Sequence, residues 1–282
     1  MTIIQAIVLG LIQGLTEFLP ISSTGHLTVA GKLMGVISAE HPERWTSFIA
    51  VIQLGTLLAV LIYFRNELID IIRDFIGDNL INRKKYSEQT VNSKLGWLII
   101  IGSIPVVIVG LGFKDLIEGA FTKNLYVISG SLIFFGLVLA FSEKKGKFYK
   151  DMNDITWKDS LIIGIFQTFA LIPGSSRSGT TITGGLFSGL KRDVAARFSF
   201  LLGIPAILGS GLLEFYQSLE YLDASSAVNL AVATLVSAIS GYFAIDFLIK
   251  YLKKHSTQVF VSYRVAIAIL ILYLITSNVI SP

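Results

Sequence analysis

The sequence contains no cysteine, and only 15% of its 282 residues are charged. The lack of cysteine excludes disulfide bonds and thiolate metal sites. Soluble domains carry roughly 25% charged residues, so the depletion of charge along the whole chain indicates a protein that lies in a membrane. The net charge of +4 is too small to suggest a nucleic-acid partner. The N-terminal stretch MTIIQAIVLG has no basic residues, so we expect no removable signal peptide.

The chain is instead rich in apolar residues: 53% of its residues are hydrophobic, and its mean hydropathy is +0.70. A helix needs about 20 apolar residues to cross the hydrocarbon core of a bilayer. Six stretches approach that length: 47–64, 95–112, 124–142, 198–216, 227–249 and 259–280. The last three contain Glu214, Asp246 and Arg264, each near an end, where we expect the charge to reach the interface. The sequence therefore predicts an all-α polytopic membrane protein with six transmembrane helices.

Two further apolar regions, 2–37 and 160–190, are interrupted by proline, glycine and serine. The interruptions lie at Pro20–Gly25 and at Pro173–Gly179. The apolar pieces on either side are too short to span a bilayer. Such pieces suit re-entrant helical hairpins, because irregular backbone at membrane depth is tolerated where protein covers it. A kinked span or an interfacial segment is the alternative at each place.

The two interrupted regions resemble each other. Gln13 matches Gln167, and Gly25 matches Gly179, while Pro20-Ile-Ser22-Ser23 reads like Pro173-Gly-Ser175-Ser176. We infer an internal duplication with one repeat at 1–145 and a second at 155–282, within a single membrane domain. Because three spans, an odd number, separate the hairpins, the second copy enters from the opposite face. The sequence thus predicts an inverted repeat whose hairpins meet and build the site.

Basic residues are concentrated in four loops of this layout. The loops 65–94, 143–158, 191–197 and 250–264 hold 18 of the 23 lysines and arginines. Cytoplasmic loops of membrane proteins are enriched in these residues. We therefore expect the four loops in the cytoplasm and both chain termini outside.

The first interruption carries a carboxylate among apolar residues, which in a membrane segment indicates function. Glu17 lies four residues after Gln13, on one face of a helix. The turn that follows holds Ser22, Ser23, Thr24 and His26. The hydroxyls could cap the second half-helix, and the free N–H groups of a helix start also bind anions.

The second interruption supplies the opposite charge. Arg177 has the geometry to grip a phosphate with two hydrogen bonds. Around it lie glycines that allow close backbone approach and hydroxyls that can bind an anion: Gly174, Ser175, Ser176, Ser178, Gly179, Thr180 and Thr181. The pattern is typical of an anion-binding nest.

Together the two interruptions suit phosphate-ester or pyrophosphate chemistry. Arg177 and backbone N–H groups would neutralise the phosphoryl group, with a divalent cation on Glu17. The nucleophile is either a serine activated by His26 or Glu17, or a metal-bound water. A transporter or flippase for a phosphorylated lipid is the alternative, because broken helices in inverted repeats are typical of transporters.

These residues resemble the undecaprenyl-pyrophosphate phosphatase family of bacterial inner membranes, also called bacitracin-resistance proteins. The family's (E/Q)xxxE motif appears as Gln13-Gly-Leu-Thr-Glu17, running into FLPISSTGH, and its PGxSRSGxT motif spans Pro173–Thr181. The similarity also covers SFIAVIQLGTLLAV and RFSFLLGIPA. Glutamine at position 13 is within the family pattern, but it disfavours a mechanism with two carboxylates there.

The resemblance implies hydrolysis of undecaprenyl pyrophosphate to undecaprenyl phosphate and inorganic phosphate, which recycles the lipid carrier of cell-wall synthesis. It also implies dependence on Mg²⁺ or Ca²⁺, a site reached from the outer face of the cytoplasmic membrane, a homodimer, and resistance to bacitracin. The residues that it places in the active site are Glu17, Ser22, Ser23, His26 and Arg177. Those that it places beside the phosphate are Gln13, Gly174, Ser176, Ser178 and Thr181.

Overall fold

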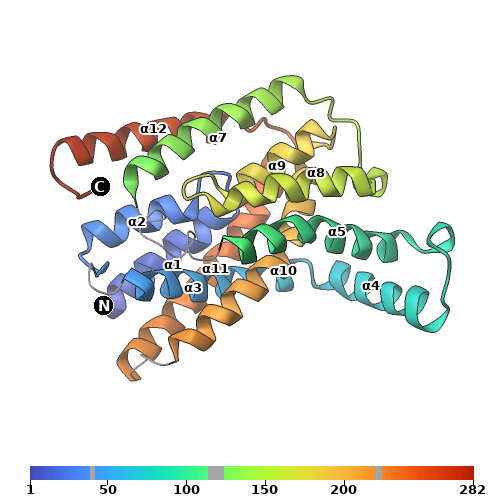
Figure 1. The fold of residues 1–282 in the computed structure, drawn as a ribbon, viewed down its shortest axis with the longest axis horizontal. Coiled ribbons are helices and arrows are strands. Elements are labelled where there is room, and N and C mark those ends of the chain that lie inside the picture. Colours follow the sequence, from blue (N-terminus) through green and yellow to red (C-terminus); the bar gives the residue numbers. More distant parts are fainter. Residues whose placement is uncertain (39–41, 114–123, 220–223) are drawn as a thin grey trace.

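The computed structural model of the chain describes residues 1–38, 42–113, 124–219 and 224–282, and its regular structure there is helical. Six helices are long and apolar enough to cross a membrane, as the sequence predicts. They are α3 (Pro42–Tyr63), α5 (Val91–Gly112), α7 (Leu125–Lys145), α10 (Arg192–Ser218), α11 (Ala224–Leu252) and α12 (Gln258–Thr276). In Figure 1, α7 and α12 lie together along one side of the molecule, and α3, α5, α10 and α11 lie on the other.

The two interrupted regions form pairs of short helices that begin and end at the predicted breaks. The first pair is α1 (Ile3–Glu17) and α2 (Ser23–Leu33), and the second is α8 (Trp157–Thr168) and α9 (Arg177–Phe187). A short 3₁₀ turn, Phe169–Leu171, follows α8. These lengths fall short of a bilayer, and the re-entrant placement of the pairs stays a prediction.

Helix packing follows the same scheme in both halves of the chain. Helix α1 packs against α11 in the first case, and α8 packs against α5 in the equivalent case. Helix α3 packs against α10. Each of the first two contacts crosses at a glycine. A Cβ atom on Gly10 would collide with the backbone oxygen of Ala233, and one on Gly164 would collide with that of Gly102. This equivalence supports the duplication, while its inverted orientation in a membrane stays a prediction.

The four basic loops meet at one end of the bundle. Arg197 lies 2.9 Å from Glu67, and the carboxylate of Glu143 binds both Arg192 and the hydroxyl of Thr257. Both chain termini lie at the opposite end (Figure 1). Part of the first basic segment is not a loop, because α4 (Arg65–Ile76) continues beyond α3 and packs against α5.

The largest apolar core lies beneath the two breaks. Phe18, directly after α1, packs edge-on against Phe200 of α10 with ring centroids 5.0 Å apart. Ile182 and Leu186 of α9 are fully buried in the same cluster. Burial of these side chains fixes the end of α1 relative to α9 and α10. The polar residues of the two breaks are therefore held on a rigid apolar base.

Candidate active site

Both second helices of the pairs begin with the same serine cap. Ser22 and Ser176 have positive φ angles of 74° and 70°. The hydroxyl of each accepts a hydrogen bond from the backbone N–H three residues later, at Gly25 (3.3 Å) and at Gly179 (3.2 Å). Two helix starts with free N–H groups therefore enter the same region.

The cap geometry corrects the register of the repeat by one residue. The sequence match paired Ser22 with Ser175, whereas the structure pairs Ser22 with Ser176, the two residues with positive φ. The glutamines at 13 and 167 have the same separation as this pair. The backbone conformation, and not the match of neighbouring residue types in the sequence, decides which serine caps the helix.

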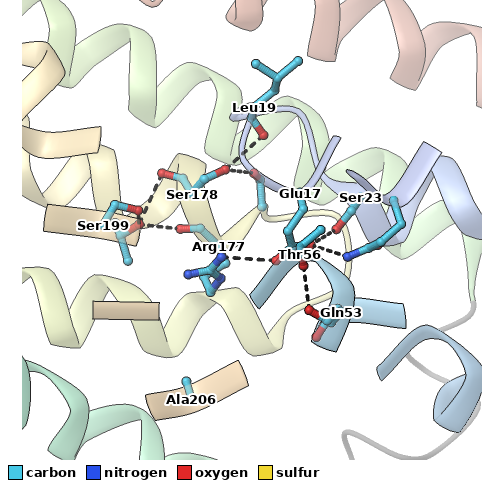
Figure 2. A network of polar contacts seen from close by, with 12 residues as sticks. Glu17, Leu19, Ser23, Gln53, Thr56, Arg177, Ser178, Ser199 and Ala206 are labelled. Atoms are coloured by element: carbon cyan, nitrogen blue, oxygen red, sulfur yellow. Dashed lines mark hydrogen bonds and ion pairs between the residues drawn. The ribbon is translucent and has the colours of Figure 1, made fainter. Parts of the chain in front are cut away.

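The corrected register makes Ser23 and Arg177 equivalent, as the first residues of α2 and α9. Both bind Glu17, which ends α1. The Ser23 hydroxyl donates to Oε2 at 2.6 Å, and Nη2 of Arg177 lies 3.2 Å from Oε1. Figure 2 shows the three side chains converging from three helices. The sequence predicted this meeting of the two breaks, and the structure confirms it.

Glu17 is buried, with only 6% of its surface exposed, and its hydrogen-bonding capacity is well used. Besides Arg177 and Ser23, it accepts a bond from Nε2 of the fully buried Gln13 at 3.0 Å. Burying a carboxylate is costly unless charge and hydrogen bonds compensate. The predicted pairing of Gln13 and Glu17 on one helical face is confirmed.

Arg177 retains unused donors. Its Nε and Nη1 atoms are buried without a hydrogen-bond partner, as are Oε1 of Gln13 and the hydroxyl of Ser175. Buried polar groups are normally paired. The guanidinium also lies so close to α10 that a Cβ on Gly203 would collide with Nη1. Orphaned cationic donors beside two helix N-termini suit a phosphate group.

The other residues of the second break tether the site. Ser178 donates to the carbonyl of Leu19 at 3.0 Å and lies 3.2 Å from the Ser176 hydroxyl. Thr181 contacts the Ser199 hydroxyl at 2.5 Å (Figure 2). Gly174 has φ 86°, and a Cβ there would collide with the backbone of Ile128 on α7. These residues hold the second break against the first, against α10 and against α7.

His26 is engaged away from Glu17. Its Nδ1 lies 2.7 Å from the carbonyl oxygen of Ser22, and its Nε2 lies 2.9 Å from the hydroxyl of Tyr263 on α12. Tyr263 had no role in the sequence-based prediction, because a tyrosine in an apolar span gives no sign of its long-range partner.

Arg264 corrects a prediction. The sequence placed it near the end of a span with its charge at the interface, but it is fully buried within α12. Its guanidinium donates to carbonyl oxygens of both breaks: Pro20 at 3.3 Å, Gly174 at 3.2 Å and Ser175 at 2.8 Å. It also donates to Leu132 and Ser131 of α7. Arg264 therefore ties the two breaks together, and the signal was a lone cation inside an apolar run.

The site offers only hard oxygen ligands to a cation. They are the Glu17 carboxylate, Oε1 of Gln13 and the neighbouring hydroxyls, which suit Mg²⁺ or Ca²⁺. Among the described residues, no three His, Asp or Glu side chains are grouped as metal ligands. One carboxylate fits a cation that shares further oxygens with a bound phosphate, and does not form a complete protein cage.

Comparison with known proteins identifies the family of the chain. The model of the family described as bacitracin resistance protein BacA matches residues 6–270. This chain belongs to the BacA family. A relative in Syntrophobacter fumaroxidans, named undecaprenyl-diphosphatase, is 56% identical over 98% of both chains. BacA relatives of the same name occur in Chloroherpeton thalassium (48% identical, 98% of both chains) and Myxococcus xanthus (47%, all of this chain and 92% of the relative).

Proposed function

We propose that the chain hydrolyses undecaprenyl pyrophosphate to undecaprenyl phosphate and inorganic phosphate. The observation that carries the proposal is the buried contact between Glu17 and Arg177 at the start of two helices, in a chain whose relatives bear the name undecaprenyl-diphosphatase. A polyprenyl substrate fits an active site among apolar helices, because its tail stays in the lipid while its headgroup enters the site. The transporter alternative has no comparable support.

Arg177 binds the terminal phosphate in this proposal. Its unused Nε and Nη1 atoms, with the N–H groups at the starts of α2 and α9, face the negative charge of the transferring phosphoryl group. Fixed donors of this kind stabilise a transition state because they need no reorganisation. The fixed ends of α1, α2 and α9 keep these donors in place.

Ser23 is the nucleophile and Glu17 its base, because the Ser23 hydroxyl donates to the Glu17 carboxylate at 2.6 Å. A bond forms between Ser23 Oγ and the terminal phosphorus, the anhydride P–O bond breaks, and the hydroxyl proton moves to Glu17. Undecaprenyl phosphate leaves with the electron pair. Water then attacks the phosphoserine and gives one proton to Nε2 of His26, which releases it to solvent. Glu17 returns its proton to Oγ, and inorganic phosphate leaves.

A Mg²⁺ or Ca²⁺ ion would be held by Glu17 and Oε1 of Gln13, with phosphate oxygens as further ligands. When bound, such an ion neutralises phosphate charge. Because Glu17 is the one carboxylate in these contacts among the described residues, the affinity of the ion for the protein alone should be low and should rise in the presence of substrate.

The membrane orientation follows from the positive-inside rule. The end of the bundle that holds the basic loops faces the cytoplasm, both termini lie outside, and the site is reached from the outer face of the cytoplasmic membrane. The homodimer and the resistance to bacitracin that the family resemblance implies complete the proposal.

The direct test is phosphate release from a polyprenyl pyrophosphate by the purified protein in detergent. We expect turnover with Mg²⁺ or Ca²⁺ and loss of turnover in EDTA. Absence of phosphate release under all conditions, from protein that is folded, would overturn the proposed function. Turnover that persists in EDTA would remove the cation from it.

A further inference from the structure

His26 contacts Tyr263, a residue that lies outside both sequence motifs. They lie on α2 and α12, and Nε2 of His26 is 2.9 Å from the Tyr263 hydroxyl. The two rings are nearly parallel, with an interplanar angle of 5° and centroids 5.6 Å apart. His26 is thus held by a helix from the far end of the chain.

The second contact of His26 determines its tautomer. Nδ1 lies 2.7 Å from the Ser22 carbonyl oxygen, which can only accept a hydrogen bond. Nδ1 must therefore carry the proton. In the neutral ring Nε2 is then the acceptor, and the Tyr263 hydroxyl is the donor to it.

The position of Tyr263 is itself fixed. The next residue, Arg264, is fully buried and binds carbonyl oxygens of both breaks, including Pro20. Helix α12 also packs along α7. Helix α12, which ties the two breaks together, therefore also places the hydroxyl of Tyr263. Tyr263 differs in this from a tyrosine whose hydroxyl only reaches the lipid headgroups.

We infer that Tyr263 is a positioning residue of the active site, which holds the His26 ring so that Nε2 is its basic nitrogen. Ser22, on the side opposite the basic nitrogen, fixes the proton on Nδ1, and the Tyr263 hydroxyl donates to Nε2 and aligns that nitrogen. The inference rests on the proposed function for its consequence in catalysis, but the hydrogen-bond pair itself is independent of it.

The kinetic test compares Tyr263→Phe with Tyr273→Phe, a change to an exposed tyrosine on the same helix. Phenylalanine keeps the ring contact and removes only the hydroxyl. We expect kcat for phosphate release to fall about tenfold in Tyr263→Phe, as for other partners that orient a histidine, with KM unchanged. Tyr273→Phe should behave as the wild type. An unchanged kcat in Tyr263→Phe would overturn the inference.

A second measurement separates positioning from general damage. In a His26→Gln background, Tyr263→Phe should cause no further loss of kcat, because the hydroxyl acts through the imidazole; a full additional loss would contradict this. Nitrogen-15 NMR of the histidines, with the His26 signals identified by their absence in His26→Gln, should show Nδ1 protonated and Nε2 not. Protonation at Nε2 of the neutral ring would overturn the tautomer argument, whatever the enzymatic activity proves to be.

Discussion

Glu17 and Arg177 are 160 positions apart in the sequence and form an ion pair of 3.2 Å in the interior of the helical bundle. One ends the first short helix, and the other begins the last. Their meeting brings a carboxylate and a guanidinium to the starts of two helices.

The close approach of the Arg177 guanidinium should require a glycine at position 203. A Cβ at this position would collide with the guanidinium, so we expect Gly203→Ala to destabilise the protein by about 1–3 kcal/mol and to reduce phosphate release. Thermal unfolding in detergent measures the first effect.

The collision also predicts coupling between the two positions. In an Arg177→Ala background, Gly203→Ala should no longer destabilise, because the atom it strikes is gone. Gly209→Ala is the control on the same helix, since a Cβ there meets no atom within 4 Å, and it should be neutral or slightly stabilising. Equal destabilisation by Gly203→Ala in both backgrounds would show that the guanidinium is not its cause.

Arg264 should be a structural requirement of the site. Arg264→Leu leaves the carbonyl oxygens of both breaks without their shared donor, and we expect a loss of about 2–4 kcal/mol of stability. Arg264→Lys should recover part of that loss, because an ammonium cannot serve the same set of carbonyls. Wild-type unfolding temperature in Arg264→Leu would refute the clamp.

Ser23 should be needed for turnover and not for folding. Ser23→Ala removes the hydroxyl that contacts Glu17, so phosphate release should fall by at least about 100-fold, while the loss of one hydrogen bond to the buried carboxylate should lower stability by only about 1–3 kcal/mol. Ser188→Ala, at the end of α9, is the control. When the wild type reacts with polyprenyl pyrophosphate labelled in the terminal phosphate, rapid quenching of the reaction should trap a phosphoserine. Substantial turnover in Ser23→Ala would favour direct attack by water.

The lack of cysteine allows a clean test of orientation. Single cysteines at positions 85 and 147 should react with a membrane-impermeant reagent only when the cytoplasmic side is opened. A cysteine at position 281 should react in intact cells whose outer barrier is permeable. The reverse pattern would invert the proposed topology.

The sequence predicts most of the fold because its signals are local. Apolar run length defines the six long helices, and proline, glycine and serine mark both breaks. The contact between Glu17 and Arg177 was predictable through the repeat. The contacts of Tyr263 and Arg264 were not predictable from the sequence. The partner of Tyr263 is the His26 ring and those of Arg264 are backbone carbonyls, all far away in the sequence. Arg264 was misplaced because burial of a cation depends on acceptors that only the folded chain supplies.

We expect that Arg177, paired with Glu17, binds the phosphate whose anhydride bond is broken. The most direct measurement is the kcat/KM for phosphate release from polyprenyl pyrophosphate by Arg177→Ala, compared with the wild type and with Lys158→Ala at the start of α8. We expect a loss of at least about 100-fold in Arg177→Ala and none in Lys158→Ala, measured on folded protein, because removal of the guanidinium also leaves the buried Glu17 without its ion pair. Wild-type kcat/KM in Arg177→Ala would contradict this expectation.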